Sequence, residues 1–416
     1  MSRNILCIDL KSFFASCECV ERKLNPFSYP LVVANKKQGN GAITLAVTPY
    51  LKSKGVKSRG RLYEIPKHIK YEIASPRMSL YIKKSKEVIS IYLDFVSQDD
   101  LHVYSIDEAF LDVTDYLKLY KMTDYELALK ILNTVYKQTG LTATCGIGPN
   151  MLLAKIAMDV EAKHVKNNIA KWTYDDIKDK LWPITPLSKV WGIGLRMEKR
   201  LNNLNIYSIY DLAHYPKEKL KAKFGVIGLD LYNHANGIDN SKIQDFKEVK
   251  KEKSISHSQV LFKNYNGSNI KLIIEEMTDI LTRRLRENKK QTSCIGLGIT
   301  YSKEYNSGFY HTTKLDIKTD DTDIILNTFF LLFDKYYNNL PIRKVTLCLS
   351  SLSKKDNVQL NLFENINDLN KKDSINSSID SIKNKFGKNS LVKATALLED
   401  STALERNKKI GGHNAW

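Results

Sequence analysis

The sequence predicts an α+β protein built from several domains, and three observations support this prediction. The chain has 416 residues, more than a single compact core normally holds. Short apolar stretches of strand length, such as 5–8 and 142–147, alternate with longer stretches whose apolar residues recur at helical spacing. Finally, a mainly helical stretch at 172–240 separates two regions in which strand and helix patterns alternate. Helices that flank short strands in this way favour sheets covered by helices.

The N-terminal part predicts one sheet with an acidic residue at a strand end. Ile5-Leu6-Cys7-Ile8 is a short apolar run that ends at Asp9, as expected of a buried strand that carries a carboxylate to its end. Helical character follows from Ser12 to Arg22. The later elements are predicted in this order: strands at 30–34 and 42–47, a basic helix end at 52–57, a helix at 80–95, an acidic segment at 103–113, a helix at 125–138, a strand at 142–147 and a helix at 150–163.

The C-terminal part predicts a helical domain, a linker and a second sheet. The stretch 182–186 interrupts the pattern, and helices with glycine punctuation follow to about residue 240. Residues 241–253 are predicted to be a linker, because Asp245 to Lys253 is highly charged and has no apolar face. After Ser353 the polar composition predicts a partly disordered tail. Between them we predict strands at 259–262, 295–301, 312–317 and 345–349 and helices near 270–288 and 322–338.

The composition is compatible with a polyanionic partner. The chain carries 64 Lys and Arg against 46 Asp and Glu, a formal net charge of +18. This balance favours nucleic acid, although a protein simply rich in Lys, Asn and Ile would explain it equally well. The six cysteines lack metal-ligand spacing, so we expect reduced thiols in a cytoplasmic protein. No signal peptide is expected before the first strand, and no apolar stretch approaches the ~20 residues of a membrane span.

Two adjacent acids, Asp107 and Glu108, provide the strongest chemical signal. They lie in the apolar context S-I-D-E-A-F-L-D-V, so both are expected to be largely buried. Neighbouring residues on a straight strand point to opposite faces, and the two carboxylates can converge only if the chain bends there. Buried acids repel unless a cation neutralises them, and Mg²⁺ is the usual hard cation for oxygen ligands. Asp9 is a plausible third ligand; for an isolated Asp-Glu pair, strand capping or pairing with lysine would be the alternative.

Two motifs resemble the signatures of Y-family DNA polymerases. These are D-L-K-S-F-F-A-S-C-E from Asp9 to Glu18 and S-I-D-E-A-F-L-D from Ser105 to Asp112, in the order and at the separation typical of that family. The resemblance implies that Asp9, Asp107 and Glu108 are catalytic ligands of two Mg²⁺ ions, with the backbone carbonyl of Leu10 as a further ligand. Asp112 is expected to be structural. It also implies a right-hand architecture with a ferredoxin-like palm sheet.

The same resemblance implies residues that bind the incoming nucleotide. Phe14 falls where the family places an aromatic ring that excludes a ribose 2′-hydroxyl; the alternative is an ordinary core phenylalanine. Aligning the Gly-Val-Lys turn at 55–57 puts Lys52 at the position of a phosphate-binding arginine and Tyr50 one residue from the family's tyrosine. Lys155 is expected near the floor of the site. Lys163 is offset by one position from the family's phosphate-binding lysine, and a solvated helix face is the alternative.

Further motifs predict contacts with DNA and with a protein partner. Gly192 and Gly194 in W-G-I-G resemble a helix-hairpin-helix, whose amides can face a DNA phosphate. Arg283 and Arg284 begin a basic run expected on the DNA-gripping domain, unless it is only a solvated surface. The pentapeptide Gln359-Leu360-Asn361-Leu362-Phe363 resembles the peptide by which bacterial polymerases bind the sliding clamp. The ending Gly-Gly-His-Asn-Ala resembles the tail of a Gram-positive branch linked to the SOS response.

The expected function is therefore error-prone, translesion DNA synthesis by a monomer that uses primer-template DNA and deoxynucleoside triphosphates. The expected domains are a palm (1–14 and 75–170), fingers (15–74), a thumb (172–240), a linker (241–253), a little finger (254–353) and a tail (354–416) with the clamp peptide. A metal-dependent nucleotide cyclase or nuclease is one rival, because both use acid pairs on comparable sheets. A DNA-binding scaffold is the other, although a pure binder would gain nothing from buried acids.

Overall fold

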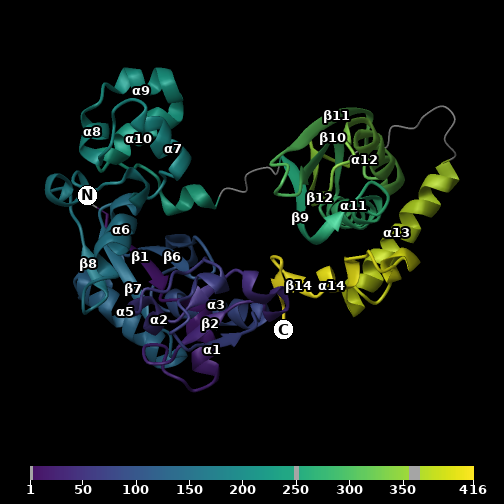
Figure 1. Cartoon of the computed structure of the whole chain (residues 1–416). Helices are drawn as coiled ribbons and strands as arrows, with labels where there is room; N and C mark the ends of the chain where they lie inside the picture. The colour runs from purple at the N-terminus through teal and green to yellow at the C-terminus, as the bar shows by residue number, and fades with distance from the viewer. Residues whose placement is uncertain (1–2, 248–252, 356–365) are drawn as a thin grey trace. The chain divides into compact units, whose positions relative to one another are not determined.

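The computed structural model describes residues 3–247, 253–355 and 366–416. It divides into two compact units, one formed by 1–249 together with 413–416 and the other by 250–412 (Figure 1). Each unit has its own apolar core. Within the described ranges, no helix has both the length and the apolar composition needed to cross a bilayer. All six cysteines are free thiols.

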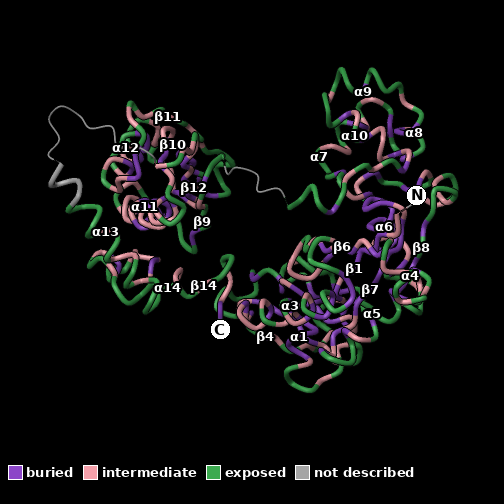
Figure 2. The backbone as a smooth tube through the Cα atoms, turned by 180° about the vertical axis from the view of Figure 1, so that it is seen from behind, coloured by how far each residue is buried: buried purple, intermediate pink, exposed green. Residues whose placement is uncertain are grey.

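The first unit is organised around a five-stranded sheet in the order β5-β6-β1-β7-β8. Strand β1 runs antiparallel to both β6 and β7, and it is buried along most of its length (Figure 2). Its even-numbered residues face the helices α3 and α5, and its odd-numbered residues face α6. Burial on both faces explains why this strand is a continuous apolar run in the sequence. The bounds are β1 Ile5–Leu10, α3 Met78–Leu93, β5 Leu101–Val103, β6 Glu108–Asp112, α4 Tyr116–Tyr120, α5 Asp124–Thr139, β7 Ala143–Gly148, α6 Met151–Ala157 and β8 Ile169–Lys171.

Helix α6 lies unusually close to β7 because two glycines lack side chains. A Cβ atom added to Gly146 would lie 2.0 Å from the carbonyl oxygen of Ala154 and 2.4 Å from the amide nitrogen of Met158. Gly148 is similarly tight, since its Cβ would lie 2.4 Å from the amide nitrogen of Ala154. This close packing therefore fixes the distance from the sheet to α6 and to the turn that follows it.

Gly146→Ala is expected to lower the free energy of unfolding by about 3 kcal/mol, because the added methyl group meets backbone rather than a movable side chain. Urea unfolding of the purified chain measures this loss. Gly41→Ala is the matched control, because no heavy atom lies within 4 Å of its Cβ position. Equal stability of the two variants would contradict the close packing of α6 on β7.

A smaller sheet and a helical region complete the first unit. The sheet has the order β3-β2-β4, with β2 antiparallel to β3 and parallel to β4. The helical region packs its own cluster around Leu187, Leu201 and Leu212. The bounds are α1 Phe13–Glu21, β2 Leu31–Val33, β3 Ala46–Val47, α2 Pro49–Ser53, β4 Glu72–Ala74, α7 Leu195–Asn202, α8 Ile209–His214, α9 Lys217–Phe224 and α10 Val226–Ala235.

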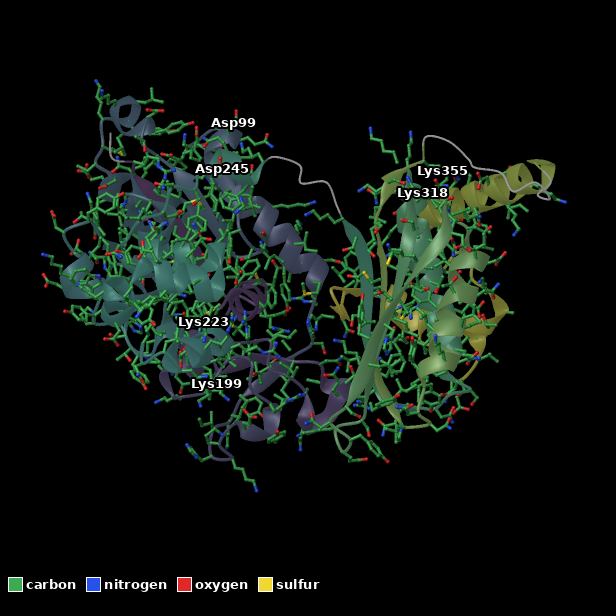
Figure 3. All side chains as sticks on the ribbon, turned by 90° about the horizontal axis from the view of Figure 1, so that it is seen from above. Asp99, Lys199, Lys223, Asp245, Lys318 and Lys355 are labelled. Atoms are coloured by element: carbon green, nitrogen blue, oxygen red, sulfur yellow. The ribbon has the colours of Figure 1, made fainter. Side chains whose placement is uncertain are left out.

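The predicted linker, 241–253, is partly wrong. Residues Ile243–Phe246 form the short 3-10 helix η7, and Ile243 is 1% exposed against the core of the first unit. The Gln244 amide donates to the Asp99 carbonyl and the Asp100 carboxylate, and Lys247 pairs with Asp99 at 2.7 Å. Asp99 and Asp245 lie near each other in Figure 3. The buried side chain of Ile243 attaches this segment to the first unit. A single apolar residue in a charged stretch gives no periodic pattern, so the sequence did not indicate this contact.

The second unit is a four-stranded sheet in the order β11-β10-β12-β9 with two helices packed against it. Every neighbouring pair in this order is antiparallel. The short strand β13 pairs with the start of β10. The bounds are β9 Ser254–Tyr265, α11 Ile270–Glu287, β10 Lys290–Tyr301, β11 Gly308–Thr319, α12 Thr322–Tyr336, β12 Ile342–Ser350 and β13 Ser353–Lys354.

The tail expected to be partly disordered is instead largely ordered where the structure describes it. Helix α13 spans Ile366–Phe386, α14 spans Ala403–Asn407, and β14 (Lys409–Ile410) pairs with β15 (His413–Asn414). Glu276 of α11, 7% exposed, accepts hydrogen bonds from Ser401 and Thr402 and pairs with Arg406 at 3.0 Å. Polar composition suggested disorder, but ion pairs and hydrogen bonds attach this segment to the folded sheet.

Candidate active site

The three predicted carboxylates gather where β1 ends and β6 begins. Asp9 lies directly opposite Glu108 in the antiparallel pair of these strands. The Leu10 N–H donates to the Asp107 carbonyl at 2.9 Å, which holds the residue before β6 against the end of β1. The chain bends before Glu108, whose carbonyl accepts from the N–H groups of Tyr104 and Ser105 at 3.0 Å. This is the bend that adjacent acids require to turn toward one site.

The other two acids are close enough to disfavour the ionised form of Asp9. Burial raises the pKa of Asp9 to about 6, and Asp107 and Glu108 add to this rise, while Lys163 opposes it. The Ser105 hydroxyl donates to Asp107 Oδ1 at 2.7 Å. Negative charge is thus concentrated in a poorly solvated corner, the usual electrostatic signature of a functional site.

Two lysines and one further acid line the other side of the corner. Lys155 Nζ lies 2.8 Å from Glu108 Oε1 and 3.1 Å from Asp159 Oδ2. Lys163 Nζ lies 3.1 Å from Asp9 Oδ2 and 2.8 Å from Asp159 Oδ1. Burial lowers the pKa of each lysine, but Cys7, Glu108 and Asp159 outweigh it at Lys155, and Asp9 and Asp159 outweigh it at Lys163, so the pKa of both is raised. Both ammonium groups are therefore charged and shared with Asp159.

A one-turn π-helix creates this arrangement. Helix α6 continues into η4, Met158–Ala162, which has π-helical hydrogen bonding. The wider turn keeps Asp159 and Lys163 on the face that Lys155 occupies one turn earlier. Such π-turns occur mostly at functional sites. Lys163, offset by one position in the sequence comparison, reaches Asp9 nonetheless.

The donor set suits a hard divalent cation. Carboxylate oxygens and a backbone carbonyl, here from Leu10, are ligands that Mg²⁺ accepts. Among the residues that the structure describes, no three His, Cys, Asp or Glu side chains are arranged closely enough to hold a metal ion. The two ammonium groups instead neutralise Asp9 and Glu108. The chemistry of the site fits a cation, with a rearrangement of Lys163 and of the carboxylates.

Phe14 lies in the first turn of helix α1, which follows β1 in the chain. Its ring is partly buried and stacks on Tyr81 with centroids 4.5 Å apart and planes at 15°. Its neighbour Phe13 is 2% exposed and belongs to the core. Phe13 is therefore the ordinary core residue of the pair, whereas Phe14 is only partly buried.

The ring of Tyr81 is itself fixed by a buried carboxylate. The Tyr81 hydroxyl donates to Glu18 Oε1 at 2.8 Å, and Glu18 is fully buried. Arg77 holds both oxygens of Glu18, at 3.0 and 2.8 Å. A paired acid and a stacked ring leave Phe14 little freedom to move aside.

Of the two basic-region candidates, one interacts electrostatically with the carboxylates, and no such interaction is seen for the other. Lys52 interacts electrostatically with Asp9 and Asp107, and incomplete solvation lowers its pKa. Tyr50 instead packs on the core of the small sheet, with Lys54 5.8 Å from its ring centroid. Lys11, which the sequence analysis missed, also interacts with Asp9. Its place two residues after Asp9 in the first motif was the available signal.

The predicted hairpin lies in the helical region of the same unit. Gly192 has φ +91°, and Gly194 precedes the first residue of α7. Trp191 anchors the hairpin to the sheet, because its ring contacts Phe110 and its indole N–H donates to the Tyr104 hydroxyl at 3.2 Å. A second hairpin, at Gly225 between α9 and α10, was missed.

The remaining predicted residues have different outcomes. Arg283 is not available as a DNA contact: it pairs with Glu287 at 2.9 Å and donates to Asn384 of α13, and its side chain is 16% exposed. Arg284 donates to the Ser256 carbonyl at 3.1 Å and is partly exposed. Asp112 accepts from the Thr114 N–H at 3.1 Å, a structural contact. The clamp-like peptide with Gln359, Leu360, Leu362 and Phe363 lies outside the described residues.

Three family models match the chain and together cover more than half of it. The model of the impB/mucB/samB family matches residues 8–159, which contain all the acids of the site. The model of that family's C-terminal domain matches 252–362, and the model of its helix-hairpin-helix motif matches 174–206.

Curated proteins and a solved structure agree with these matches. The putative UV-damage repair protein UvrX of Bacillus subtilis is 39% identical over 99% of this chain and 98% of its own length. DNA polymerase IV 2 of the same organism is 35% identical over 98% of both chains. A solved Y-family polymerase chimera of Dbh and Dpo4 shares the fold, with a TM-score of 0.65 at 20% identity over 84% of this chain and 99% of that one.

Proposed function

We propose that this chain, which belongs to the impB/mucB/samB family of Y-family DNA polymerases, extends a DNA primer past template damage by two-metal-ion nucleotidyl transfer. Asp9, Asp107 and Glu108 would hold two Mg²⁺ ions, together with the Leu10 carbonyl. The substrates would be primer-template DNA and deoxynucleoside triphosphates. The name of the UvrX relative, a putative UV-damage repair protein, supports a role in DNA repair. A role in the SOS response is proposed from the resemblance of the Gly-Gly-His-Asn-Ala ending.

One observation carries this proposal: Asp9 and Glu108 face each other across neighbouring strands, with Asp107 held at the same corner. Such a group is costly to bury unless cations neutralise it. A pair of divalent ions supplies activation of the primer hydroxyl and stabilisation of the leaving phosphate. The remaining role of the protein would be to position the primer and the nucleotide for this reaction.

The chain's own residues would position the substrates. Lys163, Lys52 and Lys11 interact with Asp9 and would supply positive charge to hold the triphosphate. The partly exposed ring of Phe14 would stand against the sugar. The amides of the hairpin at Gly192 and Gly194 would face the DNA backbone. Tyr50 has no contact with the acids among its described interactions and is a poor candidate.

The domain assignment is also a proposal. The sheet of β1 and β6 would be the palm, the sheet of β2 the fingers, the region of α7 to α10 the thumb, and the sheet of β9 to β12 the little finger. Residues 359–363 would bind the sliding clamp. Arg284 and the neighbouring lysines would contact the backbone, and Arg283 would instead hold α13.

Primer extension on an undamaged and an abasic-site template tests the function. We expect Mg²⁺-dependent extension through the lesion that requires both primer and template. Nucleotide consumption without a template would support the cyclase or nuclease rival. Tight DNA binding without any extension, with the sliding clamp present, would support the scaffold rival.

Asp159 offers a finer test of the same site. Asp159 shares Lys163 with Asp9. When Asp9 binds a cation, Asp159 would remain as the ion-pair partner of the Lys163 ammonium group. Asp159→Asn is expected to weaken binding of the incoming nucleotide about tenfold, ~1.4 kcal/mol, with a smaller change in kcat. A dideoxy-terminated primer allows this binding to be measured without chemistry.

Glu161→Gln is the matched control for Asp159→Asn. Glu161 lies in the same π-turn but accepts from the Trp172 indole at 2.6 Å and pairs with Lys180 at 3.2 Å, away from the acids. Asp159→Glu should restore most of the affinity. Nucleotide affinity unchanged in Asp159→Asn would remove Asp159 from the proposed arrangement.

A further inference from the structure

Helix α13 is attached to the second unit by its polar face. Arg286 of α11 holds both oxygens of Asp380, at 2.8 and 3.2 Å. Lys355, labelled in Figure 3, bridges Asp320 at 3.0 Å and Asp373 of α13 at 3.1 Å. Arg283 adds a hydrogen bond to Asn384. Asp373, Asp380 and Asn384 are spaced by seven and four residues, so they share one helical face.

The opposite face of α13 is apolar and open. Ile375, Ile379, Ile382 and Phe386 form a stripe, which we call the α13 seam. Ile375 is 50% exposed, Ile382 is 40% exposed and Phe386 is 66% exposed. A helix normally turns its apolar face to the core and its polar face to solvent. Here the orientation is reversed, so packing among the described residues of the second unit does not account for the seam.

The spacing of the seam indicates what kind of surface covers it. Its residues are separated by four, three and four positions, the alternation that places successive side chains along a helix-helix contact. Other exposed apolar residues of the unit, such as Leu397 and Leu398, follow no such period. The seam is about 16 Å long, which suits a short partner helix.

Charge distinguishes between possible partner helices. Lys383 and Lys385 stand beside the C-terminal half of the seam, while Asp373 and Asp380 are turned toward the second unit. The margin of the seam is therefore positive. Two copies of α13 would bring two positive margins together, and these would repel each other. A partner with acidic margins fits better.

We propose that the α13 seam is a docking surface for an amphipathic helix of another protein whose apolar stripe is flanked by Asp and Glu. The second unit serves as the rigid base, because the ion pairs of Asp373 and Asp380 fix the helix without using the seam. This surface is separate from the acids of the candidate active site and does not depend on their chemistry.

Two synthetic 21-residue helical peptides test the proposal with the full chain. Both carry Leu at the a and d positions of three heptads; one has Glu at every e and g position, and the other has Lys. Fluorescence anisotropy of the labelled peptides measures binding. We expect saturable binding of the Glu peptide and at least tenfold weaker binding of the Lys peptide.

The double variant Ile382→Ser, Phe386→Ser should weaken binding of the Glu peptide about tenfold or more. The control is Leu397→Ser, Leu398→Ser, which removes two leucines that are 73% and 58% exposed elsewhere in the unit. It should bind normally. Both changes are at exposed positions, and thermal unfolding verifies that each variant is folded; Ile382→Ser alone serves as a second, milder variant.

Three results would overturn the proposal. The first is failure of the Glu peptide to bind, and the second is equal binding by the seam variant and the wild-type chain. The third is a wild-type dimer in sedimentation equilibrium that becomes monomeric in the seam variant, since that would make a second copy the occupant.

Discussion

Primer extension by Asp107→Ala is expected to fall about a thousandfold or more, which corresponds to ~4 kcal/mol of transition-state stabilisation. Asp107 lies in the bend, where its backbone carbonyl accepts from the Leu10 N–H, and its carboxylate interacts electrostatically with Asp9. A ligand shared by two cations contributes to both the attacking and the leaving oxygen. Single-turnover extension at saturating nucleotide measures the loss.

Asp112→Asn is the matched control for this variant. Asp112 lies at the other end of β6 and accepts from Thr114, so extension should stay within a few-fold of wild type. DNA affinity, measured by anisotropy, should be unchanged in both variants. If Asp107→Ala extended a primer normally, the chain could not use these acids as metal ligands, and the proposed mechanism would be wrong.

Much of the fold could be predicted because its signals are local. The run Ile5–Ile8 is apolar throughout because both faces of β1 are covered, and the helices at 80–95 and 125–138 match α3 and α5 closely. The long strands of the second unit were predicted too short at 259–262, where β9 extends over Ser254–Tyr265. Most of its outer residues are polar and only Ile255 and Tyr265 among them are buried, so the apolar pattern marks only part of the strand.

The candidate site could be predicted in its acids but not in its charge balance. Asp9 and Glu108 are about a hundred residues apart, and the motifs indicated both. Their ion pairs are made by Lys155 of α6 and by Lys163, which follows the π-turn at 158–162. Sequence periodicity does not distinguish a π-turn from an α-helix. The spacing of Lys155, Asp159 and Lys163 by four residues was visible, but only the close packing of α6 on Gly146 places that face at the acids.

Sugar selection should fall about a hundredfold in Phe14→Ala, ~2.7 kcal/mol of discrimination. The ring stacks on Tyr81, which Glu18 and Arg77 fix in place, so it cannot retreat from a 2′-hydroxyl. Removing the ring opens this space for ribose. Relative kcat/KM for matched ribo- and deoxynucleotides on one template measures the effect.

Phe14→Tyr is the conservative control, because it keeps the ring and its stacking and should retain selection for deoxynucleotides. Phe13→Leu separates packing from selection: Phe13 is 2% exposed, so this variant should lose stability but not discrimination. Unchanged sugar selection in Phe14→Ala, with normal deoxynucleotide incorporation, would show that another group excludes ribose. The rigid support under Phe14 would then serve only the packing of α1 on α3.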